Sequence, residues 1–141
     1  MSNSIHFYNA DHPYVLRHKT AIKAWVLSTI SEEQKQLDEI SYVFCSDDYL
    51  LKINQDHLNH DTYTDIITFD YTEKGVISSE IYISVDRVSE NAKGLSVATL
   101  DEMHRVIIHG VLHLCGYKDK SKEQALEMRA KEDYYLGRRD F

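Results

Sequence analysis

Two short runs of β-branched and aromatic residues constrain the fold of this chain more than any other feature. They read TDIITFDY over residues 64–71 and VISSEIYISV over residues 76–85, and only TEKG lies between them. Runs of this composition favour β-strands, and a short connection that contains glycine joins antiparallel neighbours. We therefore expect a β-hairpin, around which the rest of the chain builds a sheet.

The segments before the hairpin alternate between helical and strand patterns. Residues 40–46, ISYVFCS, predict a strand, and the acidic start and helical spacing of residues 47–58, DDYLLKINQDHL, predict a helix. Pro13, followed by apolar positions at helical spacing up to Ile30, predicts a helix that begins close to the proline. SIHFYN, near the start of the chain, is a candidate for a further strand.

From Asp86 onward the pattern is helical. A short helix is expected first, and then a longer helix with Thr99 as its N-cap and Gly116 at its end. Ser121 is expected to cap a final helix, KEQALEMRAKEDYYL. No repeat or flexible linker interrupts this order, so we expect an α+β fold in which a small mixed β-sheet packs with helices. Residues 1–141 are expected to form a single domain.

Composition limits the functions that the chain can have. The 141 residues are 43% hydrophobic, enough for one core, and no stretch approaches the roughly 18 apolar residues of a membrane-spanning helix. The start, MSNSIHFYNADHPY, lacks the features of a secretory signal, so we expect a cytoplasmic protein without a membrane partner. A net charge of −7 disfavours broad binding of phosphate backbones, so DNA is not expected and any RNA contact is local.

A pair of histidines four residues apart lies in the apolar run HRVIIHGVLHL. Side chains at this spacing share one face of a helix, so His109 and His113 can reach a single ion. Gly110 leaves room for another element, and Gly116 can turn the chain so that Asp119 returns toward both rings. Two histidines, a carboxylate and an open position are typical of catalytic zinc sites. The alternative is that the two histidines are ordinary core or surface residues without a metal, because an isolated pair at this spacing often arises by chance.

Comparison with known metal motifs separates two kinds of site. The zinc-protease pattern H-E-x-x-H has a glutamate after the first histidine, where this chain has Gly110, so peptidase chemistry is disfavoured. HGVLHLCGYKDK instead closely resembles the H-G-x-L-H-L-x-G-Y-D-H signature of the YbeY-type endoribonucleases, and residues 109–117 agree with it at every fixed position. INQDHLNHDTYTDIITFDY and GVISSEIYISVDRV resemble further segments of that family.

The resemblance implies a mixed sheet with packed helices, a zinc-like ion held by three residues of the signature, and hydrolysis of RNA. It implies a metal-dependent, single-strand-preferring endoribonuclease that acts in 16S rRNA 3'-end maturation and ribosome quality control. Precursor rRNA and the ribosome or its proteins are then the expected partners. Two alternatives stay open. One is a ribosome-assembly binding protein whose metal is structural, and the other is a metallohydrolase of another ester.

Three positions depart from the family pattern. Asp119 stands where the pattern has its third histidine, and Lys118 where it has an aspartate. A carboxylate can ligate zinc, so the expected ligands are His109, His113 and Asp119, with Zn²⁺ as the expected ion and Mn²⁺ or Ni²⁺ as alternatives. The arginine that follows L-N-x-x-Y in the family falls on Leu58, which removes a natural phosphate contact.

Three further residues are candidates for catalysis. Arg105 lies one turn before the first histidine of the pair and could supply the missing cation for phosphate, or instead form an ion pair with Glu102 or Asp101. Asp65, in the segment that resembles the family's T-D, and Glu80, on the neighbouring strand, are candidates for the general base. The alternative for both carboxylates is an ordinary turn or strand-edge residue.

Overall fold

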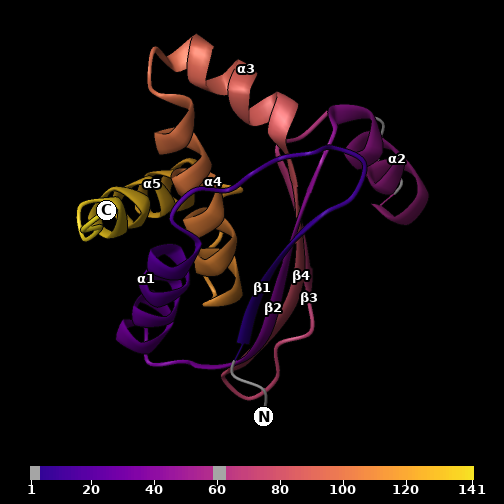
Figure 1. Ribbon diagram of the computed structural model, residues 1–141. Helices are drawn as coiled ribbons and strands as arrows, with labels where there is room; N and C mark the ends of the chain where they lie inside the picture. Colours follow the sequence, from indigo (N-terminus) through magenta and orange to yellow (C-terminus); the bar gives the residue numbers. More distant parts are fainter. Residues whose placement is uncertain (1–3, 59–62) are drawn as a thin grey trace.

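A four-stranded mixed β-sheet forms the centre of the protein (Figure 1). The computed structural model describes residues 4–58 and 63–141. Its strands are β1 (Ser4–Asn9), β2 (Gln36–Cys45), β3 (Ile66–Asp70) and β4 (Val76–Ser84), in the spatial order β1-β2-β4-β3. The β1–β2 and β2–β4 pairs are parallel, whereas β3 and β4 are antiparallel. The predicted hairpin, the mixed sheet and the additional first strand are therefore confirmed.

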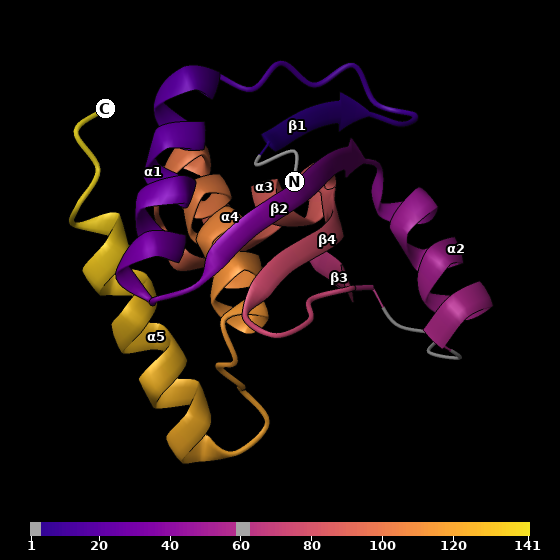
Figure 2. The same ribbon diagram turned by 90° about the horizontal axis from the view of Figure 1, so that it is seen from below.

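Helices cover the sheet unequally. They are α1 (Lys19–Glu32), α2 (Asp47–Leu58), α3 (Val85–Leu95), α4 (Thr99–Leu114) and α5 (Lys122–Leu136). Helices α1 and α4 pack against one face, and α2 lies toward the opposite side, near one end of the strands (Figures 1 and 2). Helix α5 packs against α4. This arrangement confirms the predicted α+β class and places α4 between the sheet and α5.

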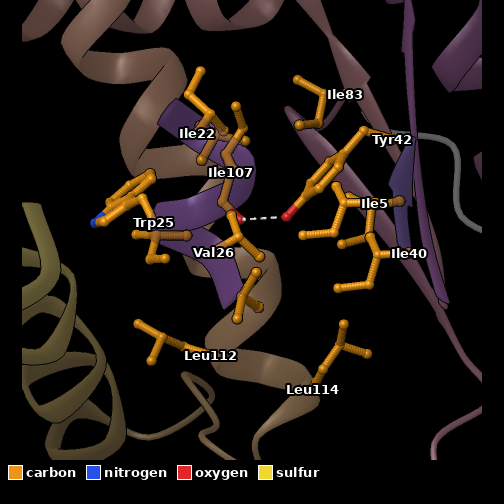
Figure 3. Packing of buried hydrophobic residues seen from close by; sticks show 14 of the residues in the cluster. Ile5, Ile22, Trp25, Val26, Ile40, Tyr42, Ile83, Ile107, Leu112 and Leu114 are labelled. Atoms are coloured by element: carbon orange, nitrogen blue, oxygen red, sulfur yellow. Dashed lines mark hydrogen bonds between the residues drawn. The ribbon is translucent and has the colours of Figure 1, made fainter. Parts of the chain in front are cut away.

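The main core fills the space between the sheet and the helices α1 and α4 (Figure 3). Ile40 and Tyr42 of β2 are fully buried, as is Ile107 of α4. The Tyr42 hydroxyl donates a hydrogen bond to the carbonyl oxygen of Ile107 at 3.3 Å, which satisfies a polar group inside the core. Helix α4 is thus held to the sheet by apolar packing and by one buried hydrogen bond.

Helix α4 approaches the hairpin closely at Gly110. A Cβ atom at this position would lie 3.0 Å from Cδ1 of Ile66 and 3.2 Å from Cδ1 of Ile81. The glycine therefore suits the narrow gap between α4 and the strands β3 and β4, in agreement with the close approach that the sequence indicated. Because His109 directly precedes Gly110 on the helix, this contact also affects how far the first histidine lies from the sheet.

The first helix begins later than the sequence predicted. It starts at Lys19, whereas a helix beginning close to Pro13 was expected. In the preceding segment, Leu16 is only 4% exposed and the ring of Tyr14 packs on Phe44 of β2 with centroids 5.0 Å apart. These contacts form from a non-helical path across the end of the sheet, so tertiary packing outweighs the helical preference that follows a proline.

Other boundaries agree more closely with the sequence. Ser121 caps α5 in a capping box with Gln124, as expected. Thr99 is the first residue of α4 and Ala98 is the cap, which corrects the predicted N-cap by one residue. Strand β2 starts at Gln36, four residues before the predicted strand, because β4 pairs with this early part. Within the described residues, no helix has the length and apolar character needed to cross a membrane.

Candidate metal centre

Helix α4 and the loop that follows it bring three side chains together. His109 and His113 lie one turn apart, with ring centroids separated by 4.5 Å. The helix ends at Leu114, and Gly116 then adopts a φ of 109°, a conformation that residues with a Cβ rarely take. The loop returns Asp119 to the rings, so that its Oδ2 lies 3.4 Å from Nε2 of His109 and 3.5 Å from Nε2 of His113.

The spacing of these donor atoms fits one tetrahedral ion. Zinc bonds of about 2.1 Å at a tetrahedral angle place two donor atoms about 3.4 Å apart. The separations between Asp119 and the two imidazole nitrogens are of this size, and ligand atoms of all three residues lie within 4.8 Å of one another. The cluster can therefore bind a metal ion. Three protein donors leave a fourth position for water or substrate, as in catalytic zinc sites.

Each histidine uses its other ring nitrogen for a hydrogen bond within the protein. Nδ1 of His109 donates to Oε2 of Glu132 at 2.6 Å, and Nδ1 of His113 donates to the carbonyl oxygen of Tyr117 at 3.0 Å. Both partners are acceptors, which assigns the proton of the neutral ring to Nδ1 and leaves the lone pair on Nε2. Both lone pairs therefore point to the side of the rings on which Asp119 lies.

Burial and neighbouring carboxylates determine the charges at the centre. Burial acts to lower the pKa of His109, but the hydrogen bond to Glu132 and the charges of Glu132 and Asp119 outweigh it, so this pKa is raised. Burial acts to raise the pKa of Glu132, but hydrogen bonds from His109 and Arg105 keep it below its ordinary value. Burial raises the pKa of Asp65. The ionised carboxylates make the centre electrostatically favourable for a cation.

A cleft of about 940 Å³ lies over the three side chains. It lies between the end of α2, the start of β3 and the loop after α4. Its volume is typical of sites that bind small ligands. Besides the metal-site residues, the cleft is lined by Asn54, Leu58, Asp65, Thr68, Lys118 and Lys120, among others. The three side chains are thus accessible from the cleft.

Of the two candidate general bases, Asp65 lines the cleft and Glu80 does not. Glu80 precedes Ile81 on β4, and the side chain of Ile81 packs beneath Gly110 of α4. Successive side chains of a strand point to opposite faces, so Glu80 lies on the face away from α4, where it accepts a hydrogen bond from the hydroxyl of Tyr71 at 3.0 Å. The structure therefore brings Asp65, and not Glu80, to the site.

Arg105 faces helix α5 and does not line the cleft. Its Nη1 lies 2.8 Å from Oε1 of Glu132, and its Nη2 lies 2.7 Å from Oδ1 of Asp133. The side chain is only 18% exposed. The partners are thus on α5, whereas the sequence suggested Glu102 or Asp101 on the same helix. Arg105 is not placed as a phosphate contact because α5 covers this side of α4.

Glu132 belongs to the centre although no pattern in the sequence indicated it. It lies 23 residues after His109, on another helix, and is only 5% exposed. A glutamate in the middle of KEQALEMRAKEDYYL has no motif that distinguishes it from its solvent-exposed neighbours. Its burial among hydrogen-bonding partners becomes evident only when α5 is packed against α4.

The fold and the site define a class of protein: a small α+β protein in which two histidines and a carboxylate that could hold a metal ion line an open cleft. Comparison of the sequence with known protein families identifies the family to which the chain belongs. The family model described as Endoribonuclease YbeY matches residues 6–139, and the chain belongs to this family. The predicted family is thereby confirmed.

Relatives and a solved structure agree with this assignment. The endoribonuclease YbeY of Cytophaga hutchinsonii is 48% identical over 139 residues, which cover 98% of this chain and 97% of that relative. The endoribonuclease YbeY of Flavobacterium psychrophilum is 52% identical over 129 residues, 92% of each chain. The solution structure of TM1509 from Thermotoga maritima matches with a TM-score of 0.67 and 26% identity, covering 94% of this chain and 87% of that one.

Proposed function

We propose that this protein is a metal-dependent endoribonuclease that prefers single-stranded RNA and acts in 16S rRNA 3'-end maturation and ribosome quality control. The observation that carries the proposal is the convergence of His109 Nε2, His113 Nε2 and Asp119 Oδ2 at the floor of an open cleft. Membership of the endoribonuclease YbeY family supports RNA as the substrate.

Zn²⁺ is the ion that we propose for the centre, with Mn²⁺ or Ni²⁺ as alternatives. Two imidazole nitrogens and a carboxylate oxygen at near-tetrahedral separations suit zinc, and the carboxylate makes harder ions more acceptable than a third imidazole would. When bound, the ion would polarise a phosphoryl oxygen of the substrate and lower the pKa of a water molecule.

Two lysines and one aspartate provide the remaining groups that RNA hydrolysis requires. Lys118 and Lys120 line the cleft, and within the part of the chain that the structure describes neither forms an ion pair. Leu58, which stands in place of a cation in the family pattern, lines the same cleft. The lysines therefore take over contact with phosphate oxygens. Asp65, whose pKa is raised by burial, accepts the proton from the attacking water as the general base.

The cleft and the charge of the chain bear on how RNA is presented. A volume of about 940 Å³ suits a ligand of nucleotide size, and the unpaired nucleotides of a single strand can enter a cleft of this kind, which supports a single-stranded substrate. A net charge of −7 leaves little general attraction for a polyanion. We therefore propose that the ribosome or one of its proteins presents the RNA, in the cytoplasm.

Cleavage assays with matched histidine variants test the proposal. Wild type, His113→Ala and His6→Ala are purified side by side and incubated with one labelled unstructured RNA, with and without ribosomes, after chelation and after addition of Zn²⁺ or Mn²⁺. His6 lies on β1, at the edge of the sheet opposite to β3. We expect slow, metal-restored cleavage by wild type and His6→Ala, and none by His113→Ala.

The rival functions give different results in the same assay. A ribosome-assembly binding protein with a structural metal retains its ion but cleaves nothing, even with ribosomes supplied. A metallohydrolase of another ester leaves RNA intact but hydrolyses small phosphoesters in a way that depends on His113. Equal cleavage by all three proteins would identify a contaminating nuclease and remove the support for the proposal.

A further inference from the structure

Glu132 occupies an unusual position behind the metal centre. Its side chain is almost fully buried, and each carboxylate oxygen has a different partner. Oε2 accepts from Nδ1 of His109 at 2.6 Å, and Oε1 accepts from Nη1 of Arg105 at 2.8 Å. A buried carboxylate is costly unless both oxygens are satisfied, so this geometry requires the two partners together.

The hydrogen bond to Glu132 controls which nitrogen of His109 can bind a metal. An imidazole that donates from Nδ1 carries its lone pair on Nε2, and a ring rotation would break the bond and turn Nε2 away from Asp119. His113 is held more weakly, because Nδ1 donates to the neutral carbonyl of Tyr117 at 3.0 Å. The two histidines therefore differ in how strongly their orientation is maintained.

Arg105 holds Glu132 in place from the other side. It contacts Glu132 and Asp133, two consecutive residues of α5, and thereby ties that helix to α4. The contact with Asp133 is more exposed, because the Asp133 side chain is 59% exposed and that of Glu132 only 6%. The ion pair at Glu132 thus joins the packing of α5 to the orientation of a metal ligand.

We propose that Glu132 is a positioning residue for the metal centre and that Arg105 acts through it, not on RNA. Glu132 sets the tautomer and the orientation of His109, and it adds a negative charge that strengthens binding of a divalent cation. The affinity of the centre for metal then depends on the docking of α5 against α4. This inference rests on the metal centre of the proposed function.

Zinc affinities of four full-length variants test the inference. Glu132→Ala removes the acceptor, and Glu132→Gln keeps the volume but loses the charge and one acceptor oxygen. Arg105→Gln removes both contacts to α5, and Asp133→Ala is the matched control, which weakens docking without touching His109. Dissociation constants for Zn²⁺ are measured by competition with a chromophoric chelator, and folding of each variant is checked by circular dichroism.

We expect both Glu132 variants to bind Zn²⁺ roughly 10- to 100-fold more weakly than wild type, and Asp133→Ala to stay within about threefold. Arg105→Gln should fall between them, because His109 keeps its acceptor but Glu132 is held on one side only. In long-range ¹H–¹⁵N spectra of the zinc-loaded protein, the Nδ1 proton of His109 should be observed in wild type and Asp133→Ala, and lost or shifted in the Glu132 variants.

Three results would overturn the inference. Zinc affinity of Glu132→Gln within threefold of wild type would reduce Glu132 to a packing role, and this test remains informative if Glu132→Ala fails to fold. If Asp133→Ala lost as much zinc affinity as the Glu132 variants, the measured effect would come from the docking of α5 alone. If wild type bound no zinc, the metal centre of the proposed function would be overturned. If wild type and the Glu132 variants bound zinc equally well, only the positioning role of Glu132 would be overturned.

Discussion

As a ligand, Asp119 would give the proposed metal centre a different charge from a site with three histidines. Its carboxylate lies within 3.5 Å of both Nε2 atoms and reaches them from a loop, whereas the histidines are held on a helix. A ligating carboxylate partly neutralises a divalent ion, so bound water is less acidified than by three neutral ligands. We therefore expect residue 119 to influence which metal the proposed centre prefers.

Substitution of Asp119 tests its role as a ligand. Asp119→Ala should lower the affinity for Zn²⁺ by at least roughly an order of magnitude, while Asp119→His should retain binding and favour softer borderline ions over Mn²⁺. Lys118→Ala is the control, since an ammonium group at neutral pH has no lone pair for a metal. Competition titrations with Zn²⁺ and Mn²⁺ measure these affinities. If Lys118→Ala and Asp119→Ala lowered the metal affinity equally, the cause would be disruption of the loop and not loss of a ligand.

A second prediction concerns His104, a buried residue of α4 that lies outside the cleft. Burial, and then the nearby charge of Arg139, lower the pKa of His104 to about 4. Nδ1 accepts a hydrogen bond from Nη1 of Arg139 at 2.7 Å, which requires the unprotonated nitrogen. Between pH 4 and the ordinary histidine value of about 6.5, the unfolded chain binds the proton and the folded chain does not.

The stability contributed by neutral His104 is therefore complete above about pH 6.5 and is lost as the pH falls toward about 4, by an amount on the order of 3 kcal/mol. Urea unfolding of metal-free protein at several pH values measures the free energy of unfolding. His104→Gln should be less stable at neutral pH but should show a shallower decline across this window. Parallel curves for wild type and His104→Gln would contradict the prediction.

Helix α4 owes its position to the close contact at Gly110. A methyl group in the gap between the helix and the hairpin would meet Cδ1 of Ile66 at 3.0 Å and Cδ1 of Ile81 at 3.2 Å, both closer than ordinary van der Waals contact. Any side chain at this position pushes α4 away from the strands or forces the isoleucines to move. The same displacement moves His109, so packing of the helix on the sheet and geometry of the metal centre are coupled through adjacent residues.

Gly110→Ala should therefore destabilise the protein by about 1–3 kcal/mol, although alanine is the better helix former. Gly94→Ala on α3 is the matched control, because a Cβ there meets nothing within 4 Å. That variant should be unchanged or more stable by about 0.5–1 kcal/mol. Chemical denaturation compares the two variants with wild type. A Gly110→Ala protein as stable as Gly94→Ala would show that the gap can widen without cost.

Across the whole molecule, the proposed metal centre joins parts of the chain that fold as separate elements. His109 and His113 belong to α4, Asp119 to the following loop, and Glu132 to α5, while the cleft extends to β3 and α2. An ion bound by the native arrangement, and not by the unfolded chain, stabilises all of these elements together. The metal should thus act on global stability as well as on chemistry.

Thermal unfolding with and without Zn²⁺ measures this linkage. At a free concentration about a thousandfold above the Kd, the ion should add about 4 kcal/mol to the free energy of unfolding and raise the Tm by several degrees. His6→Ala should show the same increase, and His113→Ala should lose most of it. A Tm increase that is identical in all three proteins would mean that zinc binds elsewhere.

Local patterns in the sequence determined most of the elements and part of the centre. The hairpin, the final helix with its Ser121 cap, and the two histidines on one helix face follow from periodicities and turn residues within short windows. The family signature at residues 109–117 was recognisable for the same reason, since its residues lie on one helix and the adjoining loop. Contacts between residues that are close in the sequence can be predicted without knowing how the elements pack together.

Packing between distant elements decided the rest. Arg105 faces Glu132 because α5 lies against α4. Glu80 points away from the centre because its neighbour on β4, Ile81, packs against α4. The first helix starts at Lys19 because the preceding segment packs across the end of the sheet. Each outcome depends on which surfaces meet, and helical or strand periodicity describes one element at a time. Glu132 thus becomes part of the metal centre only through the tertiary structure, which buries its carboxylate between an arginine and a histidine of another helix.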